Sequence, residues 1–239
     1  MLRTVILGAT TPLGATFAQQ VIERGDRVAL VGPQPGRIPL FADLATAHSD
    51  RVTLHADARR PIEATAAAAV EAVGGAVDRL ILAGWDDAAG PSISEREANR
   101  TLALLDAGAL LSHLDHNAVQ PLLQLRAFRT ALRHGIAPRA MAITSWLGGF
   151  TDHGDGGHYG AAMAAAALQM AMRAVAFDVE PDGILVLTGY PGLYRQALHA
   201  PAIQPTADEV AAGLLAVLER ADDAMRGHIV DWKGAPRAW

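Results

Sequence analysis

Two hydroxyl-bearing side chains near the middle of the sequence have the types and spacing of a proton-transfer site. Ser145 follows a strand-like apolar run, and Tyr159 comes fourteen residues later, at the start of an alanine-rich helical stretch. A serine hydroxyl beside a tyrosine phenol can polarise a carbonyl group and donate a proton to it. One helical turn after the tyrosine, where such chemistry needs a lysine, the chain has Met163. The pattern therefore predicts carbonyl chemistry with one component missing.

The missing cation decides which direction of that chemistry is favoured. A free tyrosine has a pKa near 10, and lowering it to about 7 requires roughly 4 kcal/mol from a nearby cation and other interactions. The thioether of Met163 carries no charge and is only a weak acceptor. Alcohol oxidation needs a tyrosinate base, whereas carbonyl reduction can use the proton of a neutral tyrosine. We therefore expect any activity to be better preserved in the reductive direction.

Histidines are dense around this region and could replace the missing charge. They are His113, His116, His153 and His158. His158 directly precedes Tyr159, so on a helix it points about 100° away from it. The alternative interpretation of each is a loop or surface histidine, and we consider that the more common case.

A glycine-containing turn near the N-terminus predicts a phosphate site. The sequence from Gly8 to Gly14, GATTPLG, joins a strand-like run to a helical stretch. Glycines here let the backbone approach a pyrophosphate, and the helix N-terminus offers free amides and a partial positive charge. A tight turn without a ligand is the alternative. Pro12 removes one donor from the turn.

Residues at the end of the second strand-like run indicate whether such a turn would bind NAD or NADP. An NAD-preferring site places a carboxylate there, against the ribose 2′-hydroxyl, and none stands near Gly32. Arg37 could fold back onto a 2′-phosphate, but a solvated residue at a helix start is an equal alternative. We predict NADP over NAD, chiefly because nothing repels the phosphate.

Strand-like and helical runs alternate throughout and must position these residues. The runs predict strands at 4–7, 27–31, 52–55, 79–83, 139–144, 184–188 and 228–231, and helices at 13–23, 38–47, 62–73, 102–132, 159–179 and 207–221. Such alternation predicts an α/β fold: a single Rossmann-type, doubly wound parallel sheet of about seven strands with helices on both faces. No linker or repeat interrupts it, so we predict one domain over 1–239.

Bulk composition narrows the class of partner and compartment. The 239 residues carry a formal net charge of −5 and no cysteine, which excludes disulfides and Cys-ligated metal sites. No basic stripe is present, so we expect no nucleic-acid partner, and no metal site is predicted. The longest apolar run, 160–177, is mostly alanine and favours a packed helix over a membrane span. The chain enters a strand at once with no leader, so we expect a cytoplasmic protein.

Taken in order, these motifs resemble the short-chain dehydrogenase/reductase family over nearly the whole chain. The pieces are GATTPLG for the glycine loop, Asp57 after the third strand, LAG at 82–84, Asn117, Ser145, Tyr159 as the YxxxK tyrosine, Pro191-Gly192, and the final strand GHIVDWKG. The resemblance implies Tyr159, Ser145 and Asn117 as catalytic residues. It implies cofactor contacts at Gly8, Thr10, Leu13, Gly14, Arg37, Asp57, Ala83, Gly84, Pro191 and Gly192.

The chain also departs from the family pattern around the implied cofactor site. The departures are Leu7, Pro12, Leu82, Met163 and Gln196 in place of a threonine, a glycine, an asparagine, the lysine and a threonine. They leave two hypotheses open. The first is an atypical NADP(H)-dependent reductase acting on a hydrophobic or aromatic carbonyl substrate. The second is a catalytically silent binding protein, or the structural subunit of a mixed oligomer.

The surroundings of the predicted site add two further expectations. Aromatic and apolar residues cluster at the presumed pocket mouth, namely Trp146, Leu147, Phe150, Tyr190, Leu193 and Tyr194, although packing under the loops explains them equally well. The segment 85–107 is longer than the family norm and reads as a pocket-edge or interface insertion. The resemblance further implies a homodimer or homotetramer built on the helices that contain Asn117 and Tyr159.

Overall fold

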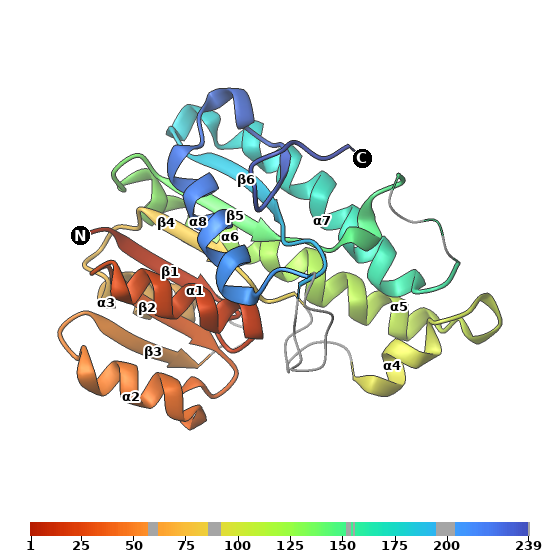
Figure 1. Ribbon diagram of the computed structural model, residues 1–239, viewed down its shortest axis with the longest axis horizontal. Helices are drawn as coiled ribbons and strands as arrows, with labels where there is room; N and C mark the ends of the chain where they lie inside the picture. Colours follow the sequence, from red (N-terminus) through yellow and green to blue (C-terminus); the bar gives the residue numbers. More distant parts are fainter. Residues whose placement is uncertain (57–61, 86–91, 152–153, 155, 195–203, 239) are drawn as a thin grey trace.

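Seven parallel strands form a single twisted sheet at the centre of the molecule (Figure 1). The computed structural model describes residues 1–56, 62–85, 92–151, 154, 156–194 and 204–238. Within them the strand order is β3-β2-β1-β4-β5-β6-β7. The strands are β1 (Arg3–Leu7), β2 (Arg27–Gly32), β3 (Val52–Ala56), β4 (Arg79–Leu82), β5 (Arg139–Ile143), β6 (Leu185–Tyr190) and β7 (Ile229–Asp231).

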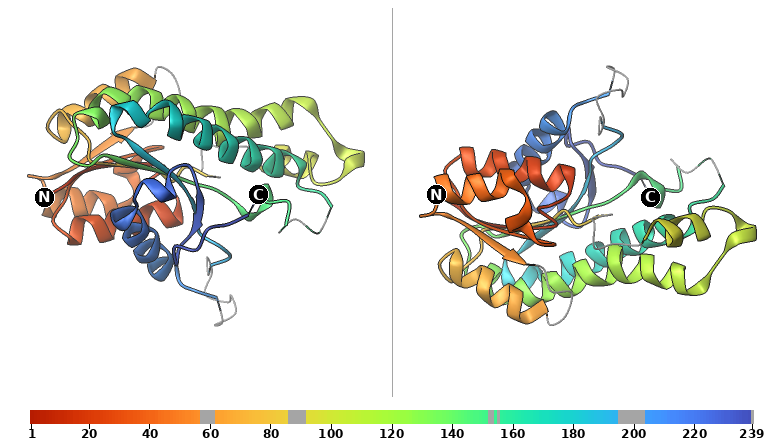
Figure 2. Two further views of the ribbon diagram at one scale, coloured as in Figure 1. Left: turned by 90° about the horizontal axis from the view of Figure 1, so that it is seen from above. Right: turned by 90° about the horizontal axis from the view of Figure 1, so that it is seen from below.

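Helices cover both faces of this sheet, as the two side views in Figure 2 show. One face carries α1 (Pro12–Glu23), α2 (Pro39–Ala47) and α8 (Ala207–Arg220). The other carries α3 (Ile62–Ala72), α6 (Gln120–Arg133) and α7 (Tyr159–Asp178). Two more helices, α4 (Ile93–Ala98) and α5 (Ala107–Leu114), extend beyond the carboxyl edge of the sheet. The doubly wound fold predicted from the alternating pattern is confirmed.

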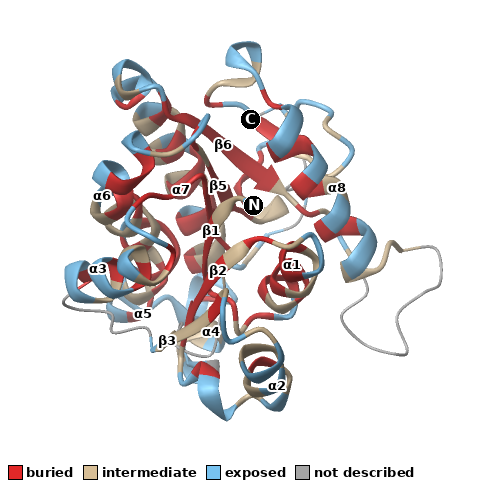
Figure 3. Ribbon diagram, turned by 90° about the vertical axis from the view of Figure 1, so that its left-hand side faces the viewer, coloured by how far each residue is buried: buried red, intermediate tan, exposed pale blue. Residues whose placement is uncertain are grey.

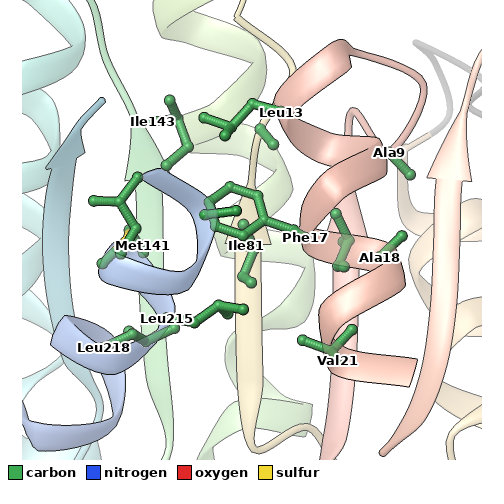
Figure 4. Close-up of a cluster of buried hydrophobic side chains, with 14 of the residues drawn as sticks. Ala9, Leu13, Phe17, Ala18, Val21, Ile81, Met141, Ile143, Leu215 and Leu218 are labelled. Carbon is green, nitrogen blue, oxygen red and sulfur yellow. The ribbon is translucent and has the colours of Figure 1, made fainter. Parts of the chain in front are cut away.

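The strands are apolar on both sides because each side meets a helical layer. Along β1, Ile6 packs into the core under α1 and α8, while Val5 and Leu7 pack into the core under α3, α6 and α7. Figure 3 shows the buried colouring concentrated along the strands and on the sheet-facing sides of the helices. In the first core, the fully buried ring of Phe17 lies over Ile81 of β4 (Figure 4). Continuous apolar strands of this kind are what a covered parallel sheet requires.

The predicted helix at 102–132 is wrong as one element, because several local features interrupt it. A 3₁₀ turn covers Leu102–Leu104, and the Asp106 carboxylate then caps α5 by accepting a hydrogen bond from the Ala109 amide at 2.8 Å. A π-helical turn, Asp115–Val119, separates α5 from α6. Two breaks therefore divide a run that periodicity alone had joined.

Helix α4 was not predicted, although its first residues carry a recognisable start signal. The Ser92 hydroxyl accepts a hydrogen bond from the Glu95 amide, and the Glu95 carboxylate accepts one from the Ser92 amide. This reciprocal pair is a capping box, a common sequence signature of a helix N-terminus. The hydrogen bonds from the Ser92 hydroxyl and amide lower the pKa of Glu95 to about 2.

Helix α7 also has the length and apolar composition that a membrane-crossing helix needs, and core helices of globular proteins often meet the same test. In this fold its side chains contact β6, α5 and the turn after β5.

A buried carboxylate anchors the amino edge of the sheet. Asp78, 1% exposed, accepts hydrogen bonds from the Arg3 amide at 2.8 Å, from the Arg3 guanidinium at 2.7 and 3.0 Å, and from the Ile136 amide at 2.6 Å. Burial by itself would raise the pKa of Asp78. The hydrogen bonds from Arg3 and Ile136 outweigh that effect and lower it below its usual value.

We predict that Asp78→Asn lowers the free energy of unfolding by about 3 kcal/mol, because the Arg3 donors then face an amide. Urea unfolding measures this, and Glu63→Gln, which breaks an exposed ion pair with Arg126, is the control with little expected change. Because folding lowers the pKa of Asp78, its contribution is fully present above the unfolded value near 4. It is lost as pH falls from there through the folded value. An Asp78→Asn variant whose unfolding midpoint matches the wild type at pH 7 would contradict this account.

Candidate functional site

The turn between β1 and α1 lies directly against the end of β4. A Cβ atom on Gly8 would stand 2.2 Å from the amide nitrogen of Gly84, and one on Gly14 would stand 2.1 Å from the Gly8 carbonyl oxygen. Gly8 also has φ +73°, which favours glycine. Packing therefore requires both glycines whether or not a ligand is bound. Their presence is compatible with a phosphate site and with a tight turn that binds no ligand.

The Thr11 side chain organises the start of α1. Its hydroxyl lies 3.0 Å from the carbonyl oxygens of both Gly8 and Ala83, to which it can donate, and it accepts a hydrogen bond from the Gly14 amide at 3.0 Å. Pro12 has no amide hydrogen, and the Ala15 amide donates to the Thr11 carbonyl. Among the described residues, the Leu13 amide has no hydrogen-bond acceptor, so it can donate to an anion. The donor set is thus smaller than a glycine at position 12 would give.

A cleft of about 510 Å³ opens beside this turn at the carboxyl edge of the sheet. Of the residues predicted to contact a cofactor, Leu13, Ala83, Pro191 and Gly192 line it. Gly8, Gly14 and Gly84 touch one another beneath it. Its remaining walls are Thr11, Pro12, Trp85, Ile143, Thr144, Ser145, Trp146, Leu193, Tyr194 and Gln204. Open α/β sheets bind their ligands at this edge.

Three other residues predicted to contact the cofactor do not line this cleft. The Thr10 hydroxyl is buried against Gly32 of β2 and has no hydrogen-bond partner among the described residues. Arg37 is exposed at the end of a 3₁₀ turn, Pro35–Arg37, and no side-chain interaction with the described residues holds it there. Asp57 lies outside the described residues. The unpartnered Thr10 hydroxyl, the Leu13 amide and the cleft beside them fit the phosphate and ribose groups of a dinucleotide.

Ser145 ends β5 at a point where two cavities meet. Its hydroxyl accepts a hydrogen bond from the Leu147 amide at 3.3 Å and caps a short 3₁₀ turn, Trp146–Gly148. The residue lines both the 510 Å³ cleft and a second cavity of about 260 Å³. A ligand in either cavity can therefore contact Ser145.

Asn117 reaches the second cavity from the π-helical turn between α5 and α6. The residue is 2% exposed and lines the cavity together with Ser145. Its neighbour His116 lies with Nε2 3.1 Å from the Gly84 carbonyl oxygen, which ties the turn to the end of β4. Single π-turns inserted between helices often mark functional sites, since they redirect side chains. The structure thus brings the predicted Ser145 and Asn117 to one cavity.

The same cavity reaches the start of α7 at Gly160 and Ala161. Further along the helix, Ala165 is fully buried against the turn after Ser145: a Cβ on Gly148 would lie 2.8 Å from the Ala165 Cβ. One more turn on, Gln169 donates to the Ser145 carbonyl at 3.4 Å. Ala165 and Gln169 therefore lie on the side of α7 that packs against the turn after Ser145.

Tyr159 is the first residue of α7, and Met163 follows it by one helical turn. The Tyr159 amide donates to the Asn99 carbonyl at 3.0 Å, so this residue begins the helix against α4. Met163, one turn on, is 45% exposed, and Met170 beyond it is 57% exposed. The helix therefore begins at the predicted Tyr159, and an uncharged thioether stands one turn after it.

The insertion at 85–107 supplies part of the wall of the second cavity. Arg96 of α4 and Asn99 after it line the cavity, with His113 of α5 and His158 before α7. His113 is only 3% exposed and lies so close to α7 that a Cβ on Gly160 would stand 2.5 Å from its ring. The insertion is thus a pocket edge, one of the two roles expected of it. The sequence analysis did not single out Arg96 or Asn99, and the Ser92–Glu95 helix start would have pointed to them.

Comparison with known proteins fits this architecture. A family model described as short chain dehydrogenase matches residues 3–205. The chain therefore belongs to the short-chain dehydrogenase/reductase family, as the motifs indicated. A relative named C-signal, from Myxococcus xanthus, is 30% identical over 123 residues, which is 52% of this chain and 74% of that protein.

Solved structures share the fold along the whole chain. The carbonyl reductase Sniffer of D. melanogaster has a TM-score of 0.85 at 18% identity and covers 100% of both chains. The NADPH-bound carbonyl reductase from chicken fatty liver has a TM-score of 0.85 at 21% identity, covering 100% of this chain and 99% of its own. A carbonyl reductase from Pseudomonas aeruginosa PAO1 in complex with NADP has a TM-score of 0.78 at 23% identity, again with 100% of both chains covered.

We predict that Gly8→Ala destabilises the protein by about 2–4 kcal/mol, because the new methyl group meets the Gly84 backbone at a positive φ. Gly36→Ala is the matched control, since a Cβ there meets nothing within 4 Å. Thermal unfolding compares the two. Equal melting temperatures would show that the β1–α1 turn does not pack on β4 as described.

Proposed function

We propose that this chain is a dinucleotide-binding member of its family whose tyrosine–lysine proton relay lacks its cation. The proposal is carried by one observation: Met163, one helical turn after Tyr159, is uncharged and 45% exposed. A tyrosine and a lysine four residues apart share one side of a helix, so Met163 stands where the lysine of the family would stand.

The chemistry that remains at this site is limited. A methionine thioether neither donates a proton nor supplies positive charge, so it does not provide the cation that a tyrosinate base needs. Ser145 can donate one hydrogen bond to a carbonyl oxygen, and Asn117 can hold a polar group or a water beside it. These groups orient a ligand, and binding without turnover is the function that they support best.

The cofactor proposed is NADP(H). Leu13, Ala83, Pro191 and Gly192 would line its binding cleft, with the Leu13 amide as a donor. When bound, the nicotinamide supplies hydride chemistry. No carboxylate stands at Gly32 or the two residues after it, so a 2′-phosphate meets no repulsion there. The NADP and NADPH complexes named for structurally similar proteins support this choice.

A second candidate function is the NADP(H)-dependent reduction of a hydrophobic or aromatic carbonyl compound. The retained Ser145 and Asn117 favour it, since both line one cavity. The apolar walls supplied by Trp146, Leu193 and Tyr194 suit such a substrate. In this case the neutral phenol of Tyr159 would donate the proton.

Restoring the missing cation separates these candidates. We predict that Met163→Lys raises NADPH-dependent reduction of an aromatic ketone by about 100-fold or more, the range ascribed to general acid–base catalysis. Ile136→Lys, at an exposed position away from α7, is the control with no expected gain. NADPH titration by fluorescence confirms that each variant still binds the dinucleotide.

Two outcomes would overturn the proposal. One is a Met163→Lys variant that binds NADPH and gains no activity. The other is a wild-type protein that already reduces ketones as fast as Met163→Lys does. Absence of NADPH binding to the wild-type protein at millimolar concentration would refute the dinucleotide part alone.

We also propose that a second copy of the chain covers the outer side of α7. Met163, Met170 and Phe177 form an apolar stripe there, exposed by 45%, 57% and 50%. Contiguous exposed apolar side chains often mark protein interfaces. Met170→Glu should weaken self-association by about tenfold or more, since a buried unpaired charge is costly. Light scattering coupled to size exclusion measures it, with Ala68→Glu at an exposed position of α3 as the control. A monomeric wild type at high concentration would contradict it.

A further inference from the structure

The segment that follows β4 borders both cavities. Ala83 lines the 510 Å³ cleft, Trp85 lines the cleft and the second cavity, and Gly84 lies between them in the chain. Because β4 ends one residue before Ala83, the carbonyl oxygens of Ala83 and Gly84 lie beyond the strand and are bonded by side chains from other elements. The Thr11 hydroxyl lies 3.0 Å from the Ala83 oxygen, and Nε2 of His116 lies 3.1 Å from the Gly84 oxygen.

These two side chains come from different parts of the fold. Thr11 belongs to the turn between β1 and α1, so its hydrogen bond joins the end of β4 to the wall of the dinucleotide cleft. His116 belongs to the π-helical turn, which carries Asn117 into the second cavity. The hydrogen bond of His116 therefore joins the turn that bears a predicted catalytic residue to the segment that borders both cavities.

The direction of the His116 ring determines the direction of the side chain that follows it. A carbonyl oxygen can only accept, so Nε2 of His116 carries the hydrogen and donates to Gly84. Adjacent residues point about 100° apart on an α-helix and somewhat less on a π-turn, so a ring held against the end of β4 directs Asn117 to one side of it. The His116 residue is 9% exposed and Asn117 is 2% exposed, so neighbouring atoms enclose both side chains.

The peptide group that accepts this hydrogen bond is packed tightly against another backbone. A Cβ atom on Gly8 would stand 2.2 Å from the Gly84 nitrogen and 2.3 Å from its Cα, so the two backbones are in direct contact. Gly84 is thus held both by Gly8 and by His116. A shift of Gly84 after loss of the hydrogen bond would be transmitted to the turn that shapes the dinucleotide cleft.

We propose that His116 is a positioning residue for this site. It lines neither of the two cavities, so it acts through Gly84 and Asn117 and not by touching a ligand. Its hydrogen bond fixes the end of β4 against the dinucleotide-binding turn and directs the Asn117 side chain into the second cavity. The expected effect on NADPH binding rests on the proposed function, whereas the placement of Asn117 does not.

Amide NMR spectra and NADPH titration of the full-length protein test this role in two variants of His116. His116→Phe keeps a ring of similar size without a donor. It should move the amide signals of Gly84 and Asn117 and weaken NADPH binding about fivefold, as expected for the loss of one hydrogen bond. His116→Gln should restore both, because its amide nitrogen reaches about as far as Nε2. His134→Phe, at an exposed position after α6, is the matched control with no expected change.

Three results would overturn the proposal. The first is that His116→Phe moves the Gly84 and Asn117 signals no more than His134→Phe does. The second is that His116→Gln moves them as far as His116→Phe, because the hydrogen bond would then not be the cause. The third is a wild type that binds NADPH with an affinity that His116→Phe leaves unchanged.

Two further measurements keep this test separate from other failures. If the wild type does not bind NADPH, the proposed function fails and the amide signals alone decide the role of His116. If His116→Phe does not fold, long-range proton–nitrogen NMR correlations of the wild-type imidazole decide it. A hydrogen on Nε2 supports the proposal, and a neutral ring with its hydrogen on Nδ1 refutes it.

Discussion

The pairing of Gln169 with the end of β5 fixes the rest of the site. This buried glutamine donates to the Thr144 hydroxyl at 3.2 Å and to the Ser145 carbonyl at 3.4 Å. Because it is one of few polar groups on the inner side of α7, sliding the helix would leave those polar atoms unpaired at a cost of about 1–3 kcal/mol each. Four residues before it, Ala165 packs against the same turn after Ser145. The rotation of α7 against the end of β5 follows from that one anchoring contact.

The residues that stabilise the fold of this chain are different from those that would carry out the reaction. The contacts among Gly8, Gly84 and Thr11 that shape the dinucleotide cleft are also the contacts that pack α1 onto the sheet. They persist for reasons of stability even where catalysis is not needed. The relay's cation has no such structural role, because Met163 in its place is 45% exposed on α7. A family member can therefore keep its fold and cleft while its chemistry changes.

The sequence predicted the sheet far better than the site. All seven strands were placed within about two residues because covered parallel strands are continuous apolar runs, which the sequence displays directly. Ser145 and Asn117 were placed at one cavity because they follow or flank such elements. Tyr159 was assigned by its spacing from Ser145 and by the YxxxK motif, and α7 begins at that residue. Helix α4 and the π-helical turn could not be predicted from an apolar pattern, because local hydrogen bonds define them.

The activity of Met163→Lys tests the central claim most directly. The account predicts that this variant reduces an aromatic ketone with NADPH about 100-fold faster than the wild type or more. A Met163→Lys variant that binds NADPH and is no faster than the wild type would contradict it.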